Sequence, residues 1–357
     1  MLRILGFVFV LLLIVAGVLV YRVLNAAGNF STVTAQFAGK CQRVGGVVGA
    51  EDIELDRATG ALFISAQDRR ADPAADGMLK QGGIYLARLD STGATSSLTA
   101  ELSRTIHPHG ISLFADPMGR KTLAVVNHPG EGGDEVMLFD VVPSPDGSDL
   151  RLTPRRTIKD PLMHSLNDVT LVSHEAFYAT NDHGAETELG KQLETWLLLP
   201  RGNVVYYDGN VAKIVAEGFN YANGINRNAD ASEIYVAEAT GRTLKTFRRD
   251  LNTGALAHIH SLFIPMGLDN IDVDSDGNLW IGAHPKLLDF MGHAGDATKL
   301  SPSAVVKVMP AGDATTFETV YVNMGEEISG SSVAVAHANK LVIGAVFDPK
   351  YLNCTLP

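Results

Sequence analysis

The chain has 357 residues, which is enough for two average domains or one large all-β domain with a sizeable core. Its formal net charge is −11, and charges of both signs are spread along the sequence, so nucleic-acid binding and a charged tail are both disfavoured. An acidic chain is compatible with cation binding, and 35 glycines are typical of a fold with many tight turns.

The N-terminus begins with an unbroken apolar run from Ile4 to Val20, between Arg3 and Arg22. The run is near the minimum for a membrane-spanning helix and longer than a usual signal-peptide core. Because no good cleavage site follows, we expect residues 1–22 to be an uncleaved signal-anchor that holds the protein to a membrane. A cleaved signal peptide and a secreted protein are the alternative. Residues 23–40 have the composition of a linker.

The two cysteines, Cys41 and Cys354, stand at the start of the globular part and almost at the end of the chain. We interpret them as a disulfide that ties the two ends together, with two unrelated buried thiols as the alternative. A disulfide indicates an oxidising compartment, so the globular part is expected to lie outside the cytoplasm, in a periplasmic, extracellular or lumenal space. Two glycosylation sequons, at Asn29 and Asn353, matter only in a eukaryotic source.

From Cys41 onward the sequence repeats a strand–turn–strand unit without a domain boundary. Six β-rich runs recur every 45–62 residues, most of them after a turn signal and an alternating apolar strand. Repeats of this length predict a β-propeller, and six runs predict six blades in one domain, residues 41–357. A Cys41–Cys354 disulfide would then close the ring by joining the first and last blades. The six runs begin at Leu62, Leu123, Phe177, Ile234, Leu279 and Leu341.

Polar clusters precede five of these runs at a similar distance, and Ser331 precedes the sixth. Each cluster taken alone is also explained by a turn, where Asn and Asp are common. In a ring of repeats, however, residues at the same position of each repeat lie at the same height along the central axis. Oxygen donors gathered there indicate a calcium site, because calcium binds carboxylate, amide and backbone oxygens. The clusters are Glu51-Asp52, His109, Asn167-Asp168, Asn223 and Asp269-Asn270.

Two segments interrupt the repeat. Residues 185–200 predict a helix with an apolar stripe formed by Leu189, Leu193, Trp196 and Leu197. That helix lies over one end of the propeller and is either a packed insertion or else a lid-like or membrane-facing helix. The charged stretch from residue 68 to residue 82 predicts a mobile loop.

Histidines are the candidates for proton transfer. His109 begins one strand and His128 ends the next, so antiparallel pairing can bring the two together. Such a pair can tune one imidazole to act as a general base, although ordinary structural histidines are the alternative. His183 and His284 follow β-rich runs and are candidates for supporting contacts. Zinc is disfavoured because both cysteines are committed elsewhere, and the sequence contains no Gly-x-Ser-x-Gly elbow.

Between Cys41 and Cys354, several motifs resemble those of the paraoxonase (arylesterase/lactonase) family and occur in the same order along the chain. The N-terminal apolar segment and the two terminal cysteines are similar as well. The motifs are Glu51-Asp52-Ile53-Glu54, Pro108-His109-Gly110, Asn127-His128-Pro129, Leu166-Asn167-Asp168, Asn181-Asp182-His183, Ala222-Asn223-Gly224 and Asp269-Asn270-Ile271.

The resemblance implies a six-bladed propeller with two calcium ions in its central tunnel. It implies a catalytic ion held by Glu51, Asn167, Asn223, Asp269 and Asn270. It implies a structural ion held by Asp52, Asp168 and the backbone carbonyl of Ile111. His109 and His128 match the family's proposed His dyad, and Asp269 is a carboxylate that could act as base or nucleophile instead. The implied activity is hydrolysis of lactones, with weaker action on aryl esters and sometimes on organophosphates.

The chain departs from the family at Ala283, where mammalian members carry a free cysteine, so no thiol chemistry can depend on that position. The loop at 68–82 and the helix at 185–200 also diverge, so substrate preference does not transfer. Two other functions stay open from the sequence. One is a non-catalytic, membrane-anchored calcium-binding propeller that acts as a binding or chaperone module, and the other is a hydrolase of sugar lactones.

Overall fold

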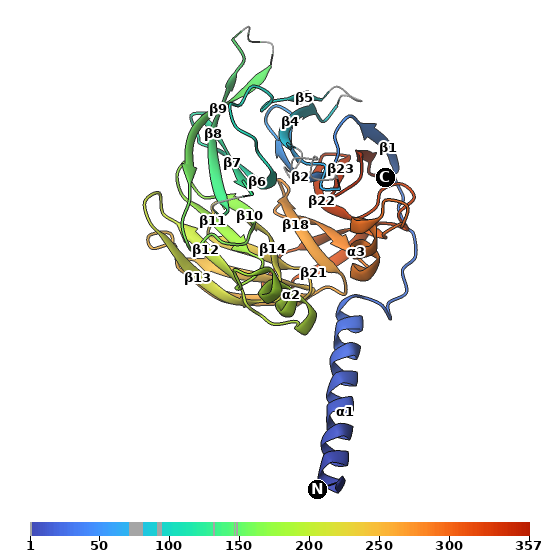
Figure 1. Ribbon diagram of the computed structural model, residues 1–357. Coiled ribbons are helices and arrows are strands. Elements are labelled where there is room, and N and C mark those ends of the chain that lie inside the picture. Colours follow the sequence, from blue (N-terminus) through green and yellow to red (C-terminus); the bar gives the residue numbers. More distant parts are fainter. Residues whose placement is uncertain (1, 71–80, 91–94, 131–132, 146, 148) are drawn as a thin grey trace.

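The computed structural model describes residues 2–70, 81–90, 95–130, 133–145, 147 and 149–357. Within these residues the chain forms three helices and six four-stranded antiparallel sheets, arranged as blades around a central axis (Figure 1). From the inner strand outward, the first three blades are β2 (Ala50–Asp56), β3 (Ala61–Ala66), β4 (Gly83–Arg88), β5 (Ser96–Ser97); β6 (Pro108–Ala115), β7 (Lys121–Asn127), β8 (Glu135–Pro143), β9 (Leu150–Ile158); and β10 (Leu166–Leu171), β11 (Phe177–Asn181), β12 (Gly202–Tyr207), β13 (Ala212–Phe219).

The remaining blades complete the ring, and the six inner strands contact one another in chain order. The predicted six-bladed propeller is therefore confirmed, and the six β-rich runs are the second strand of each blade. The fourth to sixth blades, again from the inner strand outward, are β14 (Ala222–Arg227), β15 (Glu233–Glu238), β16 (Thr243–Arg249), β17 (Leu256–Phe263); β18 (Gly267–Val273), β19 (Leu279–His284), β20 (Ser303–Met309), β21 (Thr316–Asn323); and β22 (Ser331–His337), β23 (Lys340–Ala345), β24 (Lys350–Thr355), β1 (Lys40–Gly45).

The ring is closed inside its last blade. Strand β1 from the N-terminal side pairs with β24 from the C-terminal side, and Cys41 lies directly opposite Cys354 in that pair. The predicted disulfide joins them. Both cysteines belong to one blade, so the bond fixes the first strand to the last sheet rather than linking two blades, as the sequence had suggested.

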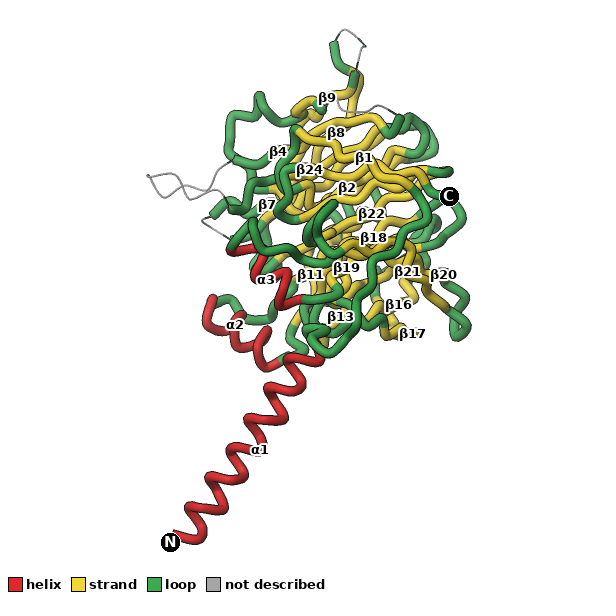
Figure 2. The backbone as a smooth tube through the Cα atoms, turned by 90° about the vertical axis from the view of Figure 1, so that its right-hand side faces the viewer, coloured by secondary structure: helices red, strands yellow, loops and turns green. Residues whose placement is uncertain are grey.

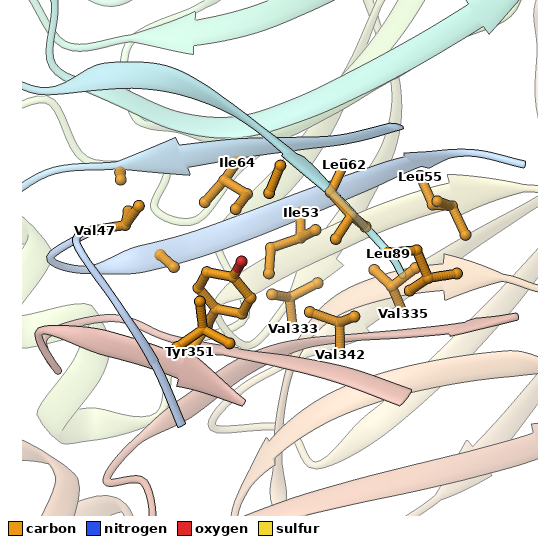
Figure 3. Packing of buried hydrophobic residues seen from close by; sticks show 14 residues of the cluster. Val47, Ile53, Leu55, Leu62, Ile64, Leu89, Val333, Val335, Val342 and Tyr351 are labelled. Carbon is orange, nitrogen blue, oxygen red and sulfur yellow. The ribbon is translucent and has the colours of Figure 1, made fainter. Parts of the chain in front are cut away.

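The blades pack on one another through apolar side chains that alternate along the strands. Between the last and first blades, Leu62 and Ile64 of β3 meet Val333 and Val342, and all four are essentially buried (Figure 3). Burial of each such side chain stabilises the fold by about 1.5–3 kcal/mol. Branched residues suit this role because they fill the pleated surface of a strand with little loss of rotamer freedom.

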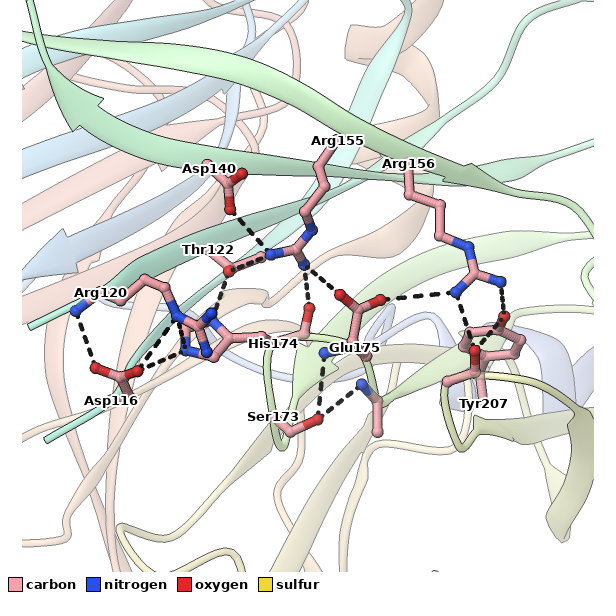
Figure 4. Close-up of polar contacts among 12 residues, drawn as sticks. Asp116, Arg120, Thr122, Asp140, Arg155, Arg156, Ser173, His174, Glu175 and Tyr207 are labelled. Carbon is pink, nitrogen blue, oxygen red and sulfur yellow. Dashed lines mark hydrogen bonds and ion pairs between the residues drawn. The ribbon is translucent and has the colours of Figure 1, made fainter. Parts of the chain in front are cut away.

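Polar contacts join the second and third blades at the end of the propeller opposite to the polar clusters. Arg155 donates to Asp140 (2.9 Å) and to the backbone carbonyl of His174, and it pairs with Glu175 at 3.4 Å (Figure 4). The His174 ring bonds Thr122 (2.7 Å). This network stabilises the far end of the ring and leaves the other end for the polar clusters.

Each inner strand loses regular pairing at the same place, near its beginning. The irregularities lie where the predicted polar clusters occur, so a bulge turns these residues out of the regular pleat, and the contacts between neighbouring inner strands bring them to the central axis. The repeat in the sequence thus reflects a repeat in backbone shape. The breaks in register fall between Ala50 and Asp52, Pro108 and Ile111, Leu166 and Val169, Ala222 and Ile225, Leu268 and Ile271, and Ser331 and Val333.

The three helices lie on one side of the propeller (Figure 2). Helix α1 (Leu2–Ala26) is apolar and exposed, and among the described residues it is the one helix long and apolar enough to cross a membrane; a signal sequence meets the same criteria. Its end is held at the start of α3 (Leu287–Gly295), where Lys286 donates to the carbonyls of Gly28 (2.8 Å) and Ser31 (2.6 Å).

Helix α2 (Glu188–Leu197) is shorter than the predicted 185–200 because Thr187 caps its start and Leu198 ends it in a left-handed conformation. It buries no residue, and Leu189 and Trp196 are 69% and 45% exposed, so the packed-insertion interpretation is wrong. It contacts α1. Helix α3 was not predicted. Of the predicted loop at 68–82, residues 71–80 lie outside the described part of the chain.

Candidate functional site

Five predicted oxygen donors meet at the central axis, each at the bulge of an inner strand. They come from four blades and are at most 6% exposed. Four side-chain oxygens have no hydrogen-bond partner among the described residues, an expensive arrangement unless a cation completes it. The unpartnered atoms are Glu51 Oε2, Asn167 Oδ1, Asn223 Oδ1 and Asn270 Oδ1. The donor set therefore fits a hard cation such as calcium.

The other atoms of these side chains are fixed. Asn270 Nδ2 donates to Glu51 Oε1 (2.9 Å) and to the Glu51 carbonyl (3.1 Å), which ties the fifth blade to the first and directs the Asn270 oxygen away. His284 Nε2 donates to Asp269 Oδ2 at 2.8 Å. Among the described residues no three His, Cys, Asp or Glu side chains gather as a metal cluster. This is consistent with the ring of donors, because three of its five members are asparagine amides.

Two glycines allow the bulges of neighbouring inner strands to lie close together at the axis. A Cβ on Gly110 would lie 2.2 Å from Asp168 Oδ1, and one on Gly224 would lie 2.4 Å from the Asp269 carbonyl oxygen. Neither position accepts a side chain. The glycine that follows His109 and the glycine that follows Asn223 are therefore requirements of packing at the axis.

Asp52 and Asp168 form a second pair, each bonded to the inner strand of the next blade. Asp52 Oδ2 accepts from Ile111 N–H (2.7 Å), and Asp168 Oδ2 accepts from Ile225 N–H (2.7 Å). Burial raises the pKa of both carboxyls well above the usual range, and the charge of Asp168 raises that of Asp52 further. Two such buried carboxylates favour a cation nearby. At Ile111 the structure shows the N–H facing Asp52, while the predicted ligand was the carbonyl.

Asp269 is a carboxyl in the ring of donors, and its pKa is strongly raised. Burial raises the pKa of Asp269 to about 6, and the charge of Glu51 adds to this, while the hydrogen bond from His284 opposes it. His284 is thus a supporting partner, as the sequence suggested. Its ring also packs on Phe290 of α3, with 4.1 Å between centroids.

The structure brings His109 and His128 together as predicted. Their rings meet edge to face with 5.3 Å between centroids, and within the described residues no hydrogen bond joins them. His109 Nδ1 donates to the Asn167 carbonyl (2.8 Å), which leaves Nε2 without the proton, 3.7 Å from Glu51 Oε1. Burial lowers the pKa of His109, and Glu51 opposes this, while Arg69 and His128 lower it further.

His128 has a carboxylate partner that sequence reasoning missed. Its Nδ1 lies 2.8 Å from Asp134 Oδ1, whose second oxygen accepts from Leu166 N–H at 2.8 Å. Despite burial, the hydrogen bond and charge of His128 lower the pKa of Asp134, so the carboxyl is ionised. No motif marks Asp134 in the sequence.

A cavity of about 360 Å³ opens above the ring of donors. Its floor carries Glu51, His109 and Asp269, and its walls are mostly apolar. Most of the apolar wall comes from α3 and from the sixth blade, neither of which was predicted to line the site. The wall residues are Thr195, Tyr221, Ala239, Thr240, Leu287, Phe290, Met291, Val346 and Phe347. The run Leu287-Leu288-Asp289-Phe290-Met291 could have signalled α3.

His183 supports the wall of this cavity. It bonds Asp182 through Nδ1 (2.7 Å) and Thr195 of α2 through Nε2 (2.8 Å). Its ring meets Tyr221 edge to face at 5.0 Å. Tyr221 has a positive φ of 61°, a strained conformation for an aromatic residue, of the kind found at functional sites. The charge of Asp182, together with burial, raises the pKa of Tyr221 well above its usual range.

Comparison with known proteins gives consistent results. The arylesterase family model matches residues 74–356. Human serum paraoxonase/arylesterase 2 is 34% identical over 324 residues, which covers 88% of each chain. Mouse serum paraoxonase/arylesterase 1 is 32% identical over 336 residues, which covers 92% of each.

Solved structures show the same fold at low sequence identity. A luciferin-regenerating enzyme superposes with a TM-score of 0.54 at 12% identity, covering 90% of this chain and 96% of that one. A gluconolactonase from Xanthomonas campestris gives 0.53 at 16% identity, covering 91% and 94%. Regucalcin from Agrobacterium tumefaciens, a calcium-binding protein, gives 0.52 at 14% identity, covering 91% and 97%. At these identities the likeness concerns the fold alone.

Proposed function

The chain belongs to the arylesterase (paraoxonase) family of hydrolases, and from this premise we propose that it is a calcium-dependent lactonase that also cleaves aryl esters. The observation that carries the metal dependence is the set of four unpartnered, buried oxygens at the axis, directly below an apolar cavity. The proposed catalytic ligands are Glu51, Asn167, Asn223, Asp269 and Asn270. A second, structural ion would be held by Asp52, Asp168 and Ile111.

Bound calcium would act as a Lewis acid, polarising the ester carbonyl and stabilising the oxyanion that forms from it. His109 supplies the base. Its Nδ1–H is committed to the Asn167 carbonyl, so Nε2 carries the lone pair, and the lowered pKa of His109 keeps that nitrogen unprotonated near neutral pH. Nε2 therefore takes a proton from the water that attacks the carbonyl carbon.

His128 then supports His109. Asp134 fixes the orientation of the His128 ring, and the His128 side chain is 34% exposed, so it can pass a proton to solvent. Asp269 is the competing candidate, since a carboxylate with a pKa of about 6 can itself act as a base or nucleophile.

A hydrolysis panel distinguishes these roles. Wild type and His109→Gln are assayed on γ- and δ-lactones, acyl-homoserine lactones and phenyl acetate. If His109 is the base, lactone hydrolysis falls by about a hundredfold or more in the variant. A lactone rate that is unchanged in His109→Gln excludes the histidine and leaves Asp269. If wild type hydrolyses none of these substrates, a non-catalytic binding module is the better description.

We further propose that α1 anchors the protein with the propeller outside the cytoplasm. The exposed apolar surface of α1 and the Cys41–Cys354 disulfide both support this location, and a secreted form fits them as well. Full-length protein should float with liposomes in a density gradient, and a variant that lacks residues 1–22 should float much less. Equal flotation would argue against α1 as the anchor.

A further inference from the structure

Arg69 is a partly buried cation beside the site that the proposed mechanism does not use. It follows β3, and its Nη2 donates to the backbone carbonyl of Pro108 at 3.0 Å. Its Nη1 is buried and has no hydrogen-bond partner in the described part of the chain. Arginine cannot lose its charge in a protein, and a buried charged donor without an acceptor is costly. The site is therefore incomplete without an acceptor at Nη1.

Arg69 lies near two carboxylates from different blades. Its guanidinium interacts with Glu51 from the first blade and Asp269 from the fifth. Pro108, which holds its other edge, directly precedes His109. A group that senses both carboxylates lies close to the axis, next to the proposed base.

Arg70 holds this segment in place by pointing the other way. Its Nε and Nη2 donate to the His293 carbonyl (3.1 and 2.7 Å), and Nη1 donates to the Phe347 carbonyl (3.1 Å). Its guanidinium also lies 4.8 Å from the centre of the Phe347 ring. Arg70 thus ties the segment that carries Arg69 to α3 and to the sixth blade.

We propose that Arg69 is a carboxylate-binding residue beside this cavity, and that its unpartnered N–H edge holds the anion formed when the ester bond opens. This rests on the proposed function. His109 takes one proton from the water that adds to the carbonyl carbon, the bond to the alcohol oxygen breaks, and that oxygen receives this proton. The acid formed releases the second proton of the water to solvent and leaves as a carboxylate. The substrate is neutral and the product is an anion, so only the product offers the planar pair of oxygens that a guanidinium matches.

Binding measurements test this without requiring turnover. Benzoate, 4-hydroxybutanoate and the neutral analogue benzamide are titrated by calorimetry into calcium-loaded wild type, Arg69→Gln and Arg69→Lys. We expect the two carboxylates to bind Arg69→Gln at least tenfold more weakly, Arg69→Lys to fall between, and benzamide to bind all three equally. A merely structural role would weaken benzamide as well.

Arg120→Gln is the control, since it removes the same charge from the turn between β6 and β7 at the opposite end of the propeller, where the side chain is 61% exposed. Its benzoate affinity should stay within about threefold of wild type. The proposal is overturned if wild type does not bind benzoate, if Arg69→Gln binds it normally, or if Arg120→Gln loses as much. Should wild type hydrolyse no ester, these titrations still decide the role of Arg69 independently.

Discussion

Nδ1 of His128 lies 2.8 Å from Oδ1 of Asp134, and this pair ties the His128 ring to the beginning of β10. The second oxygen of Asp134 accepts from Leu166 N–H, and the next residue, Asn167, offers its carbonyl to His109. The N–H of Leu166 and the carbonyl of Asn167, which are consecutive residues of β10, thus orient both histidines. An inner strand of the third blade sets the geometry of a pair that belongs to the second.

Replacing Asp134 with Asn should lower kcat by roughly tenfold to a hundredfold, a part of what general-base catalysis contributes, with little change in KM. An amide cannot accept from both His128 and Leu166 N–H without turning its NH2 group toward a donor, so the ring loses its fixed orientation. Steady-state kinetics with a chromogenic ester and a pH–rate profile measure this. If kcat and the profile are unchanged in a folded variant, Asp134 has no part in catalysis.

Replacing Gly110 with Ala should destabilise the protein by about 1–3 kcal/mol and weaken calcium binding. The new methyl group would overlap Asp168 Oδ1 and lies 2.5 Å from the Asp168 Cα, which is backbone and cannot swing away. Gly45→Ala is the control, because nothing lies within 4 Å of a Cβ there. Urea unfolding compares the two, and equal stabilities would contradict the close approach at the axis.

The stabilising effect of calcium should grow as the pH rises from 5 to 7. Burial raises the pKa of Asp269 to about 6, above its unfolded value, so the native metal-free protein holds this proton more tightly than the unfolded chain. The contribution of Asp269 to stability therefore falls as pH rises from about 4 to 6, and the ionised form that calcium needs becomes available over the same range. Melting temperatures with calcium and with a chelator test this. A calcium-induced shift of equal size at pH 5 and pH 7 would be inconsistent with it.

Removing the disulfide with Cys41→Ala and Cys354→Ala should lower the free energy of unfolding by at most about 5–6 kcal/mol, since the bond closes a loop of 313 residues. The blade pairing of β1 with β24 remains, so the variant should keep its strand content while unfolding at a lower denaturant concentration. Circular dichroism with urea provides the measurement. Wild type treated with a reductant is the control and should lose about as much, and an unchanged midpoint would show that strand pairing alone closes the ring.

Much of the fold could be predicted because the sequence pattern repeats once in each blade. The six β-rich runs became the second strands, and the five polar clusters and Ser331 fell at the six bulges of the inner strands. Equal phase in the sequence gave equal height at the axis because every blade repeats the same hairpin. His109 and His128 could be paired for the same reason, since β6 and β7 are consecutive and antiparallel.

The parts that were missed depend on contacts between distant segments. Helix α3 and Phe347 line the cavity because the ring brings the fifth and sixth blades beside the site. Arg69 and Asp134 carry no motif, and their importance follows only from which carbonyl, carboxylate or backbone N–H each one meets. The disulfide was predicted correctly, but the strand order that places both cysteines in one blade was not visible from spacing.

Restoring calcium to the chelated enzyme while hydrolysis is followed tests the central claim most directly. Protein is stripped with a chelator, its residual calcium is measured by elemental analysis, and lactone hydrolysis is recorded as calcium is added back. Asn223→Ala, which removes one unpartnered oxygen of the ring, is titrated in parallel. The account predicts no hydrolysis without calcium, saturable recovery in wild type, and recovery at higher calcium concentration in the variant. Full lactone hydrolysis by protein that contains no calcium would contradict it.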